Sequence, residues 1–200
     1  VRVGSFATVP DVLRDLGFDP ATVLSGAGVD MSLFDSPENR ISITTRSDVL
    51  QHCAEVTRCG HFGLLVGQRN GLHGLGLVGL LARYSEDVQT ALSNLIRYFH
   101  LHVRGASISL TVHEGKAILG HQLYQSSTAA YAHTGDGAVA WLLNILHELC
   151  GHRQRPLEIL LNHRPPDNIK PFRDFFRAPV TFNAGQNAVV FPAAWLAKGM

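Results

Sequence analysis

A glycine-rich segment contains the first residues with a recognisable chemistry. Residues 74–79 read GLGLVG and match the pattern G-x-G-x-x-G, in which backbone N–H groups bind the pyrophosphate of a dinucleotide. That chemistry needs a strand before the first glycine and a helix after it, inside a parallel βαβ unit. Here the segment breaks at Tyr84 and Ser85, and no such unit follows. We therefore interpret it as apolar chain packed tightly between helices rather than as a nucleotide site.

Histidines suggest a second chemistry, the binding of a metal ion. His147 and His152 flank Glu148 in a segment similar to the zinc signature H-E-x-x-H. They are five residues apart, about 140° around a helix, whereas the signature needs both ligands on one face at a spacing of four. His100 and His102 could provide two ligands, but no cysteine or carboxylate partner can be named beside them. The sequence therefore predicts neither a metal site nor a cofactor.

No set of residues forms a recognisable catalytic constellation. The sequence has no G-x-S-x-G nucleophile elbow, and its three cysteines lack the context of a catalytic nucleophile. Asp136 and Glu148 are isolated acids on a predicted helix, where we expect them to lie on the solvated side. The favoured prediction is a protein that is not an enzyme, and an unrecognised enzyme is the weakest alternative.

Composition and charge narrow the class of protein. Of the 200 residues, 46% are hydrophobic and 16% are charged, as in an ordinary globular domain. The 17 basic and 16 acidic residues give a net charge of +1, without the basic patch of a nucleic-acid-binding surface. No apolar run approaches about 18 residues, and the N-terminus lacks the pattern of a signal peptide. We expect a cytoplasmic protein with no membrane segment and with buried, reduced thiols.

Helices are predicted throughout the first half of the chain and once in the second half. Capping residues precede apolar runs at Thr8, Asp19 and Thr45, and the clearest helix begins at Ser85. A later helix over residues 131–150 is apolar on two faces. One face is rich in leucine, and the opposite face carries Trp141 and Ile145. We expect this later helix to be buried between two partners.

Strands are predicted only in the second half. Alternating polarity and turn residues indicate five strands, at residues 106–113, 117–123, 156–161, 180–182 and 187–191, with a short helix at 169–176. The order β-β-α-β-α-β-β after a helical prefix predicts an α+β fold with one largely antiparallel sheet. We expect a helical portion over residues 1–105 and a sheet portion over residues 106–200, which together form one composite domain.

The order and spacing of several segments resemble one known family. The C-terminal residues 171–182, with the sequence PFRDFFRAPVTF, and residues 187–196 are similar to the end of the N-terminal arabinose-binding-like domain of AraC/XylS-family transcription regulators. Residues 62–67, 75–79 and 91–98 agree in the middle of the chain, as does the turn at 26–30 before Arg40 and Ile41. The resemblance implies an effector domain that is truncated before a DNA-binding domain with two helix-turn-helix units, through which the parent protein reaches DNA.

The leading hypothesis is therefore a sensor of a small molecule that also forms a homodimer. Its site is expected in an apolar cavity between the sheet and the two long helices, with a few polar groups that fix the ligand. Candidate ligand-binding residues are Tyr98, His102, Tyr124 and Trp141. Packing alone also explains each of them, and His121 could be a satisfied core histidine. The class of effector is not predicted.

A rival hypothesis makes the domain chiefly a dimerisation module without a ligand. Trp141 and Ile145 then form the subunit interface, which is isologous in a two-fold dimer. Both functions can coexist in one domain. Replacing Trp141 with a charged residue separates them, because it should lower association in one case and the response to an effector in the other.

Overall fold

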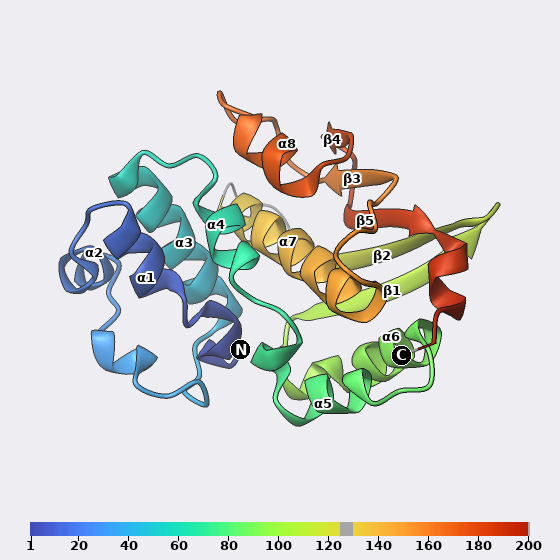
Figure 1. The fold of residues 1–200 in the computed structure, drawn as a ribbon. Helices are drawn as coiled ribbons and strands as arrows, with labels where there is room; N and C mark the ends of the chain where they lie inside the picture. Colours follow the sequence, from blue (N-terminus) through green and yellow to red (C-terminus); the bar gives the residue numbers. More distant parts are fainter. Residues whose placement is uncertain (125–129, 200) are drawn as a thin grey trace.

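The chain is built around one long helix, α7 (Ala130–Cys150), which lies between N-terminal helices and a five-stranded sheet (Figure 1). The computed structural model describes residues 1–124 and 130–199. α3 (Ile43–Thr57) and α4 (Phe62–Gln68) pack on α7 from one side, and β2 (Lys116–Leu123) and β5 (Asn187–Pro192) pack on it from another. This arrangement confirms the predicted α+β fold, and it explains why α7 is apolar on two faces.

Capping side chains set the starts of α2 (Pro20–Gly26) and α3, but not of α1 (Val9–Asp15). The predicted cap at Thr8 is wrong, because its hydroxyl forms no capping bond and instead donates to the carbonyl oxygen of Val66 at 3.4 Å. The Asp19 carboxylate accepts a hydrogen bond of 2.9 Å from a backbone N–H in the first turn of α2, as its sequence predicted. α3 begins before the predicted cap at Thr45. The reason is that the Ser42 hydroxyl accepts a 2.9 Å hydrogen bond from the Thr45 N–H, so Ser42 is the cap.

Glycines allow α4 and α7 to approach each other closely. A Cβ atom at Gly63 would lie 2.0 Å from the carbonyl oxygen of His133. A Cβ atom at Gly67, one turn later, would lie 2.3 Å from the carbonyl oxygen of Gly137. Any side chain at these two positions would overlap backbone, so the two helices are in direct backbone contact.

The glycine-rich segment 74–79 begins α5 (Leu77–Arg83) rather than a nucleotide-binding turn. Its first two residues end the 3₁₀ helix η3 (Leu72–Leu75) instead of a strand, and Gly76 precedes α5 with a φ of +53°. Without a preceding strand, its N–H groups are not arranged as in a βαβ dinucleotide site. The interpretation as chain packed between helices is correct only in part, because the segment itself forms the end of η3 and the start of α5. Gly79 packs closely on the backbone of Leu72, but Leu77 is 84% exposed.

α6 (Val88–Tyr98) begins three residues after the predicted start at Ser85. Its cap is Asp87, whose carboxylate accepts a 2.7 Å hydrogen bond from the N–H of Thr90. Further 3₁₀ helices join the other elements: η1 (Val3–Phe6), η2 (Met31–Phe34), η4 (Phe99–Leu101) and η5 (Ala193–Ala197). Across the described ranges, no helix is long and apolar enough to span a bilayer.

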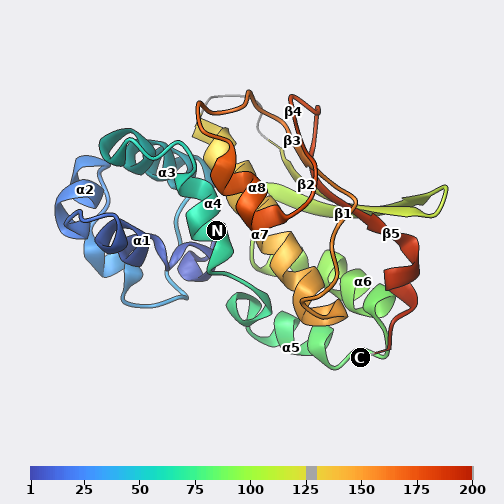
Figure 2. The same cartoon turned by 45° about the horizontal axis from the view of Figure 1, so that its top comes forward.

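The sheet has the strand order β1-β2-β5-β3-β4. β1 (Ala106–His113) pairs antiparallel with β2, and β2 and β3 (Glu158–Leu161) both pair antiparallel with β5. β4 (Val180–Phe182) is parallel to β3, and α8 (Lys170–Phe176), which packs on β4, connects the two strands (Figure 2). The largely antiparallel sheet and the predicted order of its elements are confirmed.

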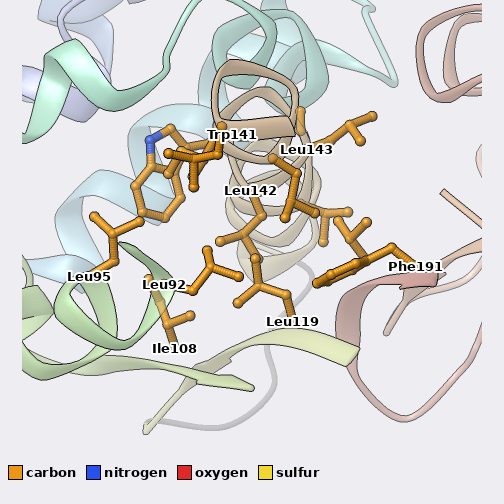
Figure 3. Packing of buried hydrophobic residues seen from close by; sticks show 14 of the residues in the cluster. Leu92, Leu95, Ile108, Leu119, Trp141, Leu142, Leu143 and Phe191 are labelled. Atoms are coloured by element: carbon orange, nitrogen blue, oxygen red, sulfur yellow. The ribbon is translucent and has the colours of Figure 1, made fainter. Parts of the chain in front are cut away.

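Two hydrophobic clusters form the core. One contains buried residues between 3 and 66, and the other contains buried residues between 64 and 196, including those of α5 and α6. Figure 3 shows Leu142 and Leu143 of α7 directed toward the sheet, near Leu119 and Phe191. The helical portion predicted over residues 1–105 therefore contributes to both clusters, and α4 and α7 hold the clusters together.

Candidate functional site

A cavity lies where the N-terminal helices meet α7 and the open end of the β1–β2 hairpin. The empty space in and around it, including its opening to solvent, is about 650 Å³, and about 40 Å³ of this space can hold the centre of a water-sized sphere. Its apolar wall includes Leu50, Val66, Leu75, Phe99, Val103 and Trp141. Its polar lining side chains are Arg2, Arg46, Asn70, His102, His121 and Thr134. Both core clusters therefore contribute to one cavity.

Arg46 is the most unusual of the polar residues. It is 9% exposed on the inner side of α3, and its Nε atom is buried without a hydrogen-bond partner. Its guanidinium lies over the ring of Phe6 at 6.0 Å, but no ion pair joins it to another described residue. Burial lowers the pKa of Arg46 to about 10, so it remains charged at neutral pH. The cavity therefore contains a buried positive charge that lacks a counter-ion among the described residues.

His121 contributes a second unpartnered polar atom from β2. It is 8% exposed, it meets the ring of Phe99 edge-on, and its Nδ1 atom has no hydrogen-bond partner. Burial, followed by the charge of Arg46, lowers the pKa of His121 to about 4, so the ring is neutral at physiological pH. His121 therefore points inward as expected, but its ring lacks a hydrogen bond at Nδ1.

Arg2 and His102 form a third polar group in the wall. An Nη atom of Arg2 lies 3.3 Å from Nδ1 of His102, and Arg2 also forms an ion pair with the more exposed Glu38. Burial and then the Arg2 charge lower the pKa of His102, so its neutral ring can accept a hydrogen bond from Arg2. In contrast with Arg46, the charge of Arg2 is already balanced.

The hydroxyl of Thr134 can offer only an acceptor to the cavity. Ser47 donates its single hydroxyl hydrogen to the carbonyl oxygen of Ile43 at 3.0 Å. Its oxygen lies 2.9 Å from the Thr134 hydroxyl, so Thr134 must be the donor in that contact. The lone pairs of Thr134 then remain for a ligand group that donates a hydrogen bond.

Trp141 forms the aromatic wall together with Phe99. Its indole Nε1 donates a 3.2 Å hydrogen bond to the carbonyl oxygen of Gly71, which fixes the ring. The ring centroids of Trp141 and Phe99 are 5.9 Å apart, at an angle of 32°. These contacts hold a rigid apolar surface at the cavity.

The family model described as "Arabinose-binding domain of AraC transcription regulator, N-term" matches residues 17–200.

The chain belongs to this family.

Two relatives of this arabinose-binding-type domain are transcription regulators of Pseudomonas aeruginosa. The chain is 22% identical over 192 residues to the ornithine utilization regulator. The aligned region covers 95% of this chain and 56% of that protein. The solved structure of the transcriptional regulator CdpR has a similar fold, with a TM-score of 0.66 at 15% identity, over 98% of this chain and 57% of that chain. The chain thus spans a little over half the length of these relatives, and the matches favour a regulatory role over catalysis.

The domain places the predicted ligand-binding residues at different sites. His102 and Trp141 line the cavity. Tyr98 is half-buried against Arg97, whose guanidinium lies 5.5 Å from its ring centre, and Tyr124 is 68% exposed. Neither tyrosine is a lining residue, and Phe99 is the aromatic residue of that segment that faces the cavity.

The predicted interface residues lie inside the domain. Trp141 is 8% exposed and Ile145 is fully buried, both within the chain's own core. The second apolar face of α7 is covered by α4 and by the chain that follows it. In this fold, neither side chain is therefore available to a second copy.

Arg46 is the functional candidate that the sequence analysis missed. It precedes Val49, Leu50 and Cys53 at a helical spacing, so it belongs to the apolar face of its predicted helix. A charged residue on an apolar helix face is the signal that could have identified it.

A second polar pair is buried at the start of α7, outside the cavity. Asp136 is 1% exposed and accepts a 2.7 Å hydrogen bond from Nε2 of His163, so the expectation of a solvated acid is wrong. Burial by itself would lower the pKa of His163, but the hydrogen bond and charge of Asp136 outweigh it and raise the pKa. This pair joins α7 to the chain after β3, because His163 lies just beyond that strand.

Proposed function

We propose that this chain is the effector-binding domain of an AraC-type transcription regulator, and that the effector binds in the cavity described above. The observation that carries the proposal is the position of the unpartnered polar atoms. Across residues 1–124 and 130–199, the two buried side-chain polar atoms without a partner are Arg46 Nε and His121 Nδ1, and both belong to cavity-lining residues. Buried polar atoms cost free energy unless they form hydrogen bonds, so a ligand that supplies these bonds should be favoured.

The position of the cavity suggests how a ligand could act. Arg46 and Leu50 reach it from the N-terminal helices, whereas Phe99, His121 and Trp141 reach it from the other cluster. A ligand that contacts both groups would stabilise one arrangement of the two clusters over others. Such a difference in affinity between two states is what a regulatory ligand requires. In the parent protein, a further domain would carry this change to DNA in the cytoplasm.

A thermal-shift screen against organic acids, sugars, amino acids and amines tests this function. A ligand at 100 times its Kd should add about 2.7 kcal/mol and raise Tm by roughly 5–10 °C. The variant Ala138→Leu, which places extra atoms in the cavity, should abolish the shift, and the exposed Tyr124→Ala should retain it. An equal shift in Ala138→Leu would place the ligand elsewhere.

Self-association is a second candidate function, supported by an exposed face of α5. Leu77, Leu80, Leu81 and Tyr84 are 84%, 50%, 44% and 84% exposed, and their spacing puts them on neighbouring turns. Such a contiguous apolar patch marks an interaction surface, and we propose a second copy of the chain as its partner. Sedimentation of Leu80→Asp should show loss of the dimer, whereas Leu101→Asp, at an isolated exposed leucine, should sediment as the wild type does.

A further inference from the structure

The charges around the cavity do not cancel within the described chain. Arg46 carries a charge without an ion pair, whereas Arg2 is paired with Glu38. His102 and His121 are neutral near pH 7, because burial lowers the pKa of each. The lining residues that the structure describes include no aspartate or glutamate. The cavity therefore has one uncompensated positive charge.

We propose that the effector is a monocarboxylate with an apolar body, and that its carboxylate binds the guanidinium of Arg46. The inference rests on the proposed function, because it assigns a ligand chemistry to the same cavity. A single carboxylate would balance the single charge. It would also supply a hydrogen-bond acceptor to the unpartnered Nε–H of Arg46.

The geometry of the guanidinium favours this class of anion. Its fork of N–H donors matches the two oxygens of a carboxylate, and such charge-assisted bonds are stronger than bonds between neutral groups. His121 lies close enough to Arg46 for the arginine charge to act on its ring. The neutral imidazole can carry its hydrogen on Nδ1, so it can donate a further hydrogen bond to the same anion.

The apolar part of the cavity wall indicates the chemistry of the ligand beyond its carboxylate. Phe99 and Trp141 present tilted rings, with Leu50 and Val66 among the other apolar lining residues. An aliphatic or aromatic body would be removed from water against this surface. A phosphate monoester would bring a second negative charge without a matching cation. An amine or a basic amino acid such as ornithine would bring an ammonium group that meets no carboxylate of the described lining.

Matched probes test the proposal by calorimetry and thermal shift. The probes are octanoate, phenylacetate and benzoate, each compared with its amide and its amine. At least one carboxylate should bind the wild-type chain, while its amide and amine bind more weakly by a factor of ten or more. Arg46→Met should weaken binding of that carboxylate roughly 10- to 100-fold, because a hydrogen-bonded charge pair is lost. Arg46→Lys should bind with intermediate affinity, since it keeps the charge but loses the fork.

Controls separate this inference from the proposed function. Arg153→Met removes an exposed arginine and should bind as the wild type does. Near-ultraviolet circular dichroism checks that Arg46→Met is folded. If that variant is not folded, the affinity of Arg46→Lys for the carboxylate tests the inference instead. If an amide or amine binds as tightly as its acid, or if both Arg46 variants bind the acid normally, the inference is wrong while the cavity still binds an effector. If no probe binds the wild type, the monocarboxylate inference is wrong, and the broader thermal-shift screen decides whether the cavity binds another effector. If the acid still binds normally to Ala138→Leu, the cavity assignment is also wrong.

Discussion

Two polar sites are buried against α7, and they differ in how their hydrogen bonds are completed. At the start of the helix, Asp136 and His163 satisfy each other at 2.7 Å. In the cavity, Arg46 Nε and His121 Nδ1 are buried without partners, and the charge of Arg46 further disfavours protonation of His121. The first site is complete within the chain, whereas the second lacks an acceptor for the arginine.

The difference separates a group that supports the fold from a group that awaits a ligand. A buried charge with a hydrogen-bonded partner is costly to disrupt, because removing either partner leaves the other desolvated. A buried charge without a partner already carries that cost in the folded chain. Mutations at the Asp136–His163 pair should therefore affect mainly stability, and mutations at Arg46 should affect mainly ligand binding.

The largest effect is expected at the paired site. His163→Ala leaves the carboxylate of Asp136 buried without its donor, so the free energy of unfolding should fall by about 3–5 kcal/mol. Urea denaturation at pH 6 measures this loss, and His113→Ala, with an 80% exposed side chain, is the control. Asp136→Asn should cost less, since the remaining histidine can lose its proton. A loss below about 1 kcal/mol in His163→Ala would mean that the pair is not what supports this region.

Local sequence patterns were sufficient for most of the fold. The predicted bounds of β1 and β4 agree with the structure, because alternating side chains and nearby turns define these strands within a few residues. The starts of α3 and α6 were displaced by three residues or fewer. The cap of α3 is Ser42 and the cap of α6 is Asp87. Each of these side chains accepts a hydrogen bond from a backbone N–H in the first turn of its helix.

The site was less predictable because its members are distant in sequence or follow irregular backbone. Asp136 was expected in solvent, and its partner His163 is 27 residues away, which no local pattern reveals. Tyr98 and His102 were both predicted to bind the ligand, but α6 ends at Tyr98 and the chain continues as the 3₁₀ helix η4. The altered turn places Phe99 in the cavity wall instead of Tyr98. The place of Arg46 on an apolar helix face could be read from the sequence. That its side chain lacks an ion-pair partner in the fold could not.

The two sites should also respond to pH in opposite directions. The pKa of His121 is lowered from 6.5 to about 4, so the unfolded chain binds more protons in this range and stability falls as the pH falls from about 6.5 toward 4. The pKa of His163 is raised, so its contribution is fully present below about pH 6.5 and is lost as the pH rises through the raised value.

A variant of His121 isolates its share of the acid sensitivity. Between pH 7.5 and pH 5, wild type should lose about 2 kcal/mol more stability than His121→Gln, because 1.5 pH units below 6.5 correspond to about that free energy. Urea denaturation of both proteins at the two pH values gives the difference. Equal losses would show that His121 accepts a proton in the folded chain as readily as in the unfolded chain.

The smallest change in stability is expected at Arg46 itself. Arg46→Met removes a buried charge that has no ion-pair partner among the described residues and replaces it with an apolar side chain of similar length. Without ligand, the free energy of unfolding should stay within about 1 kcal/mol of the wild-type value or rise above it. Urea denaturation at pH 7.5 in ligand-free buffer measures this. A loss of about 2 kcal/mol or more would mean that the guanidinium supports the fold as His163 does, and the contrast between the two sites would then be wrong.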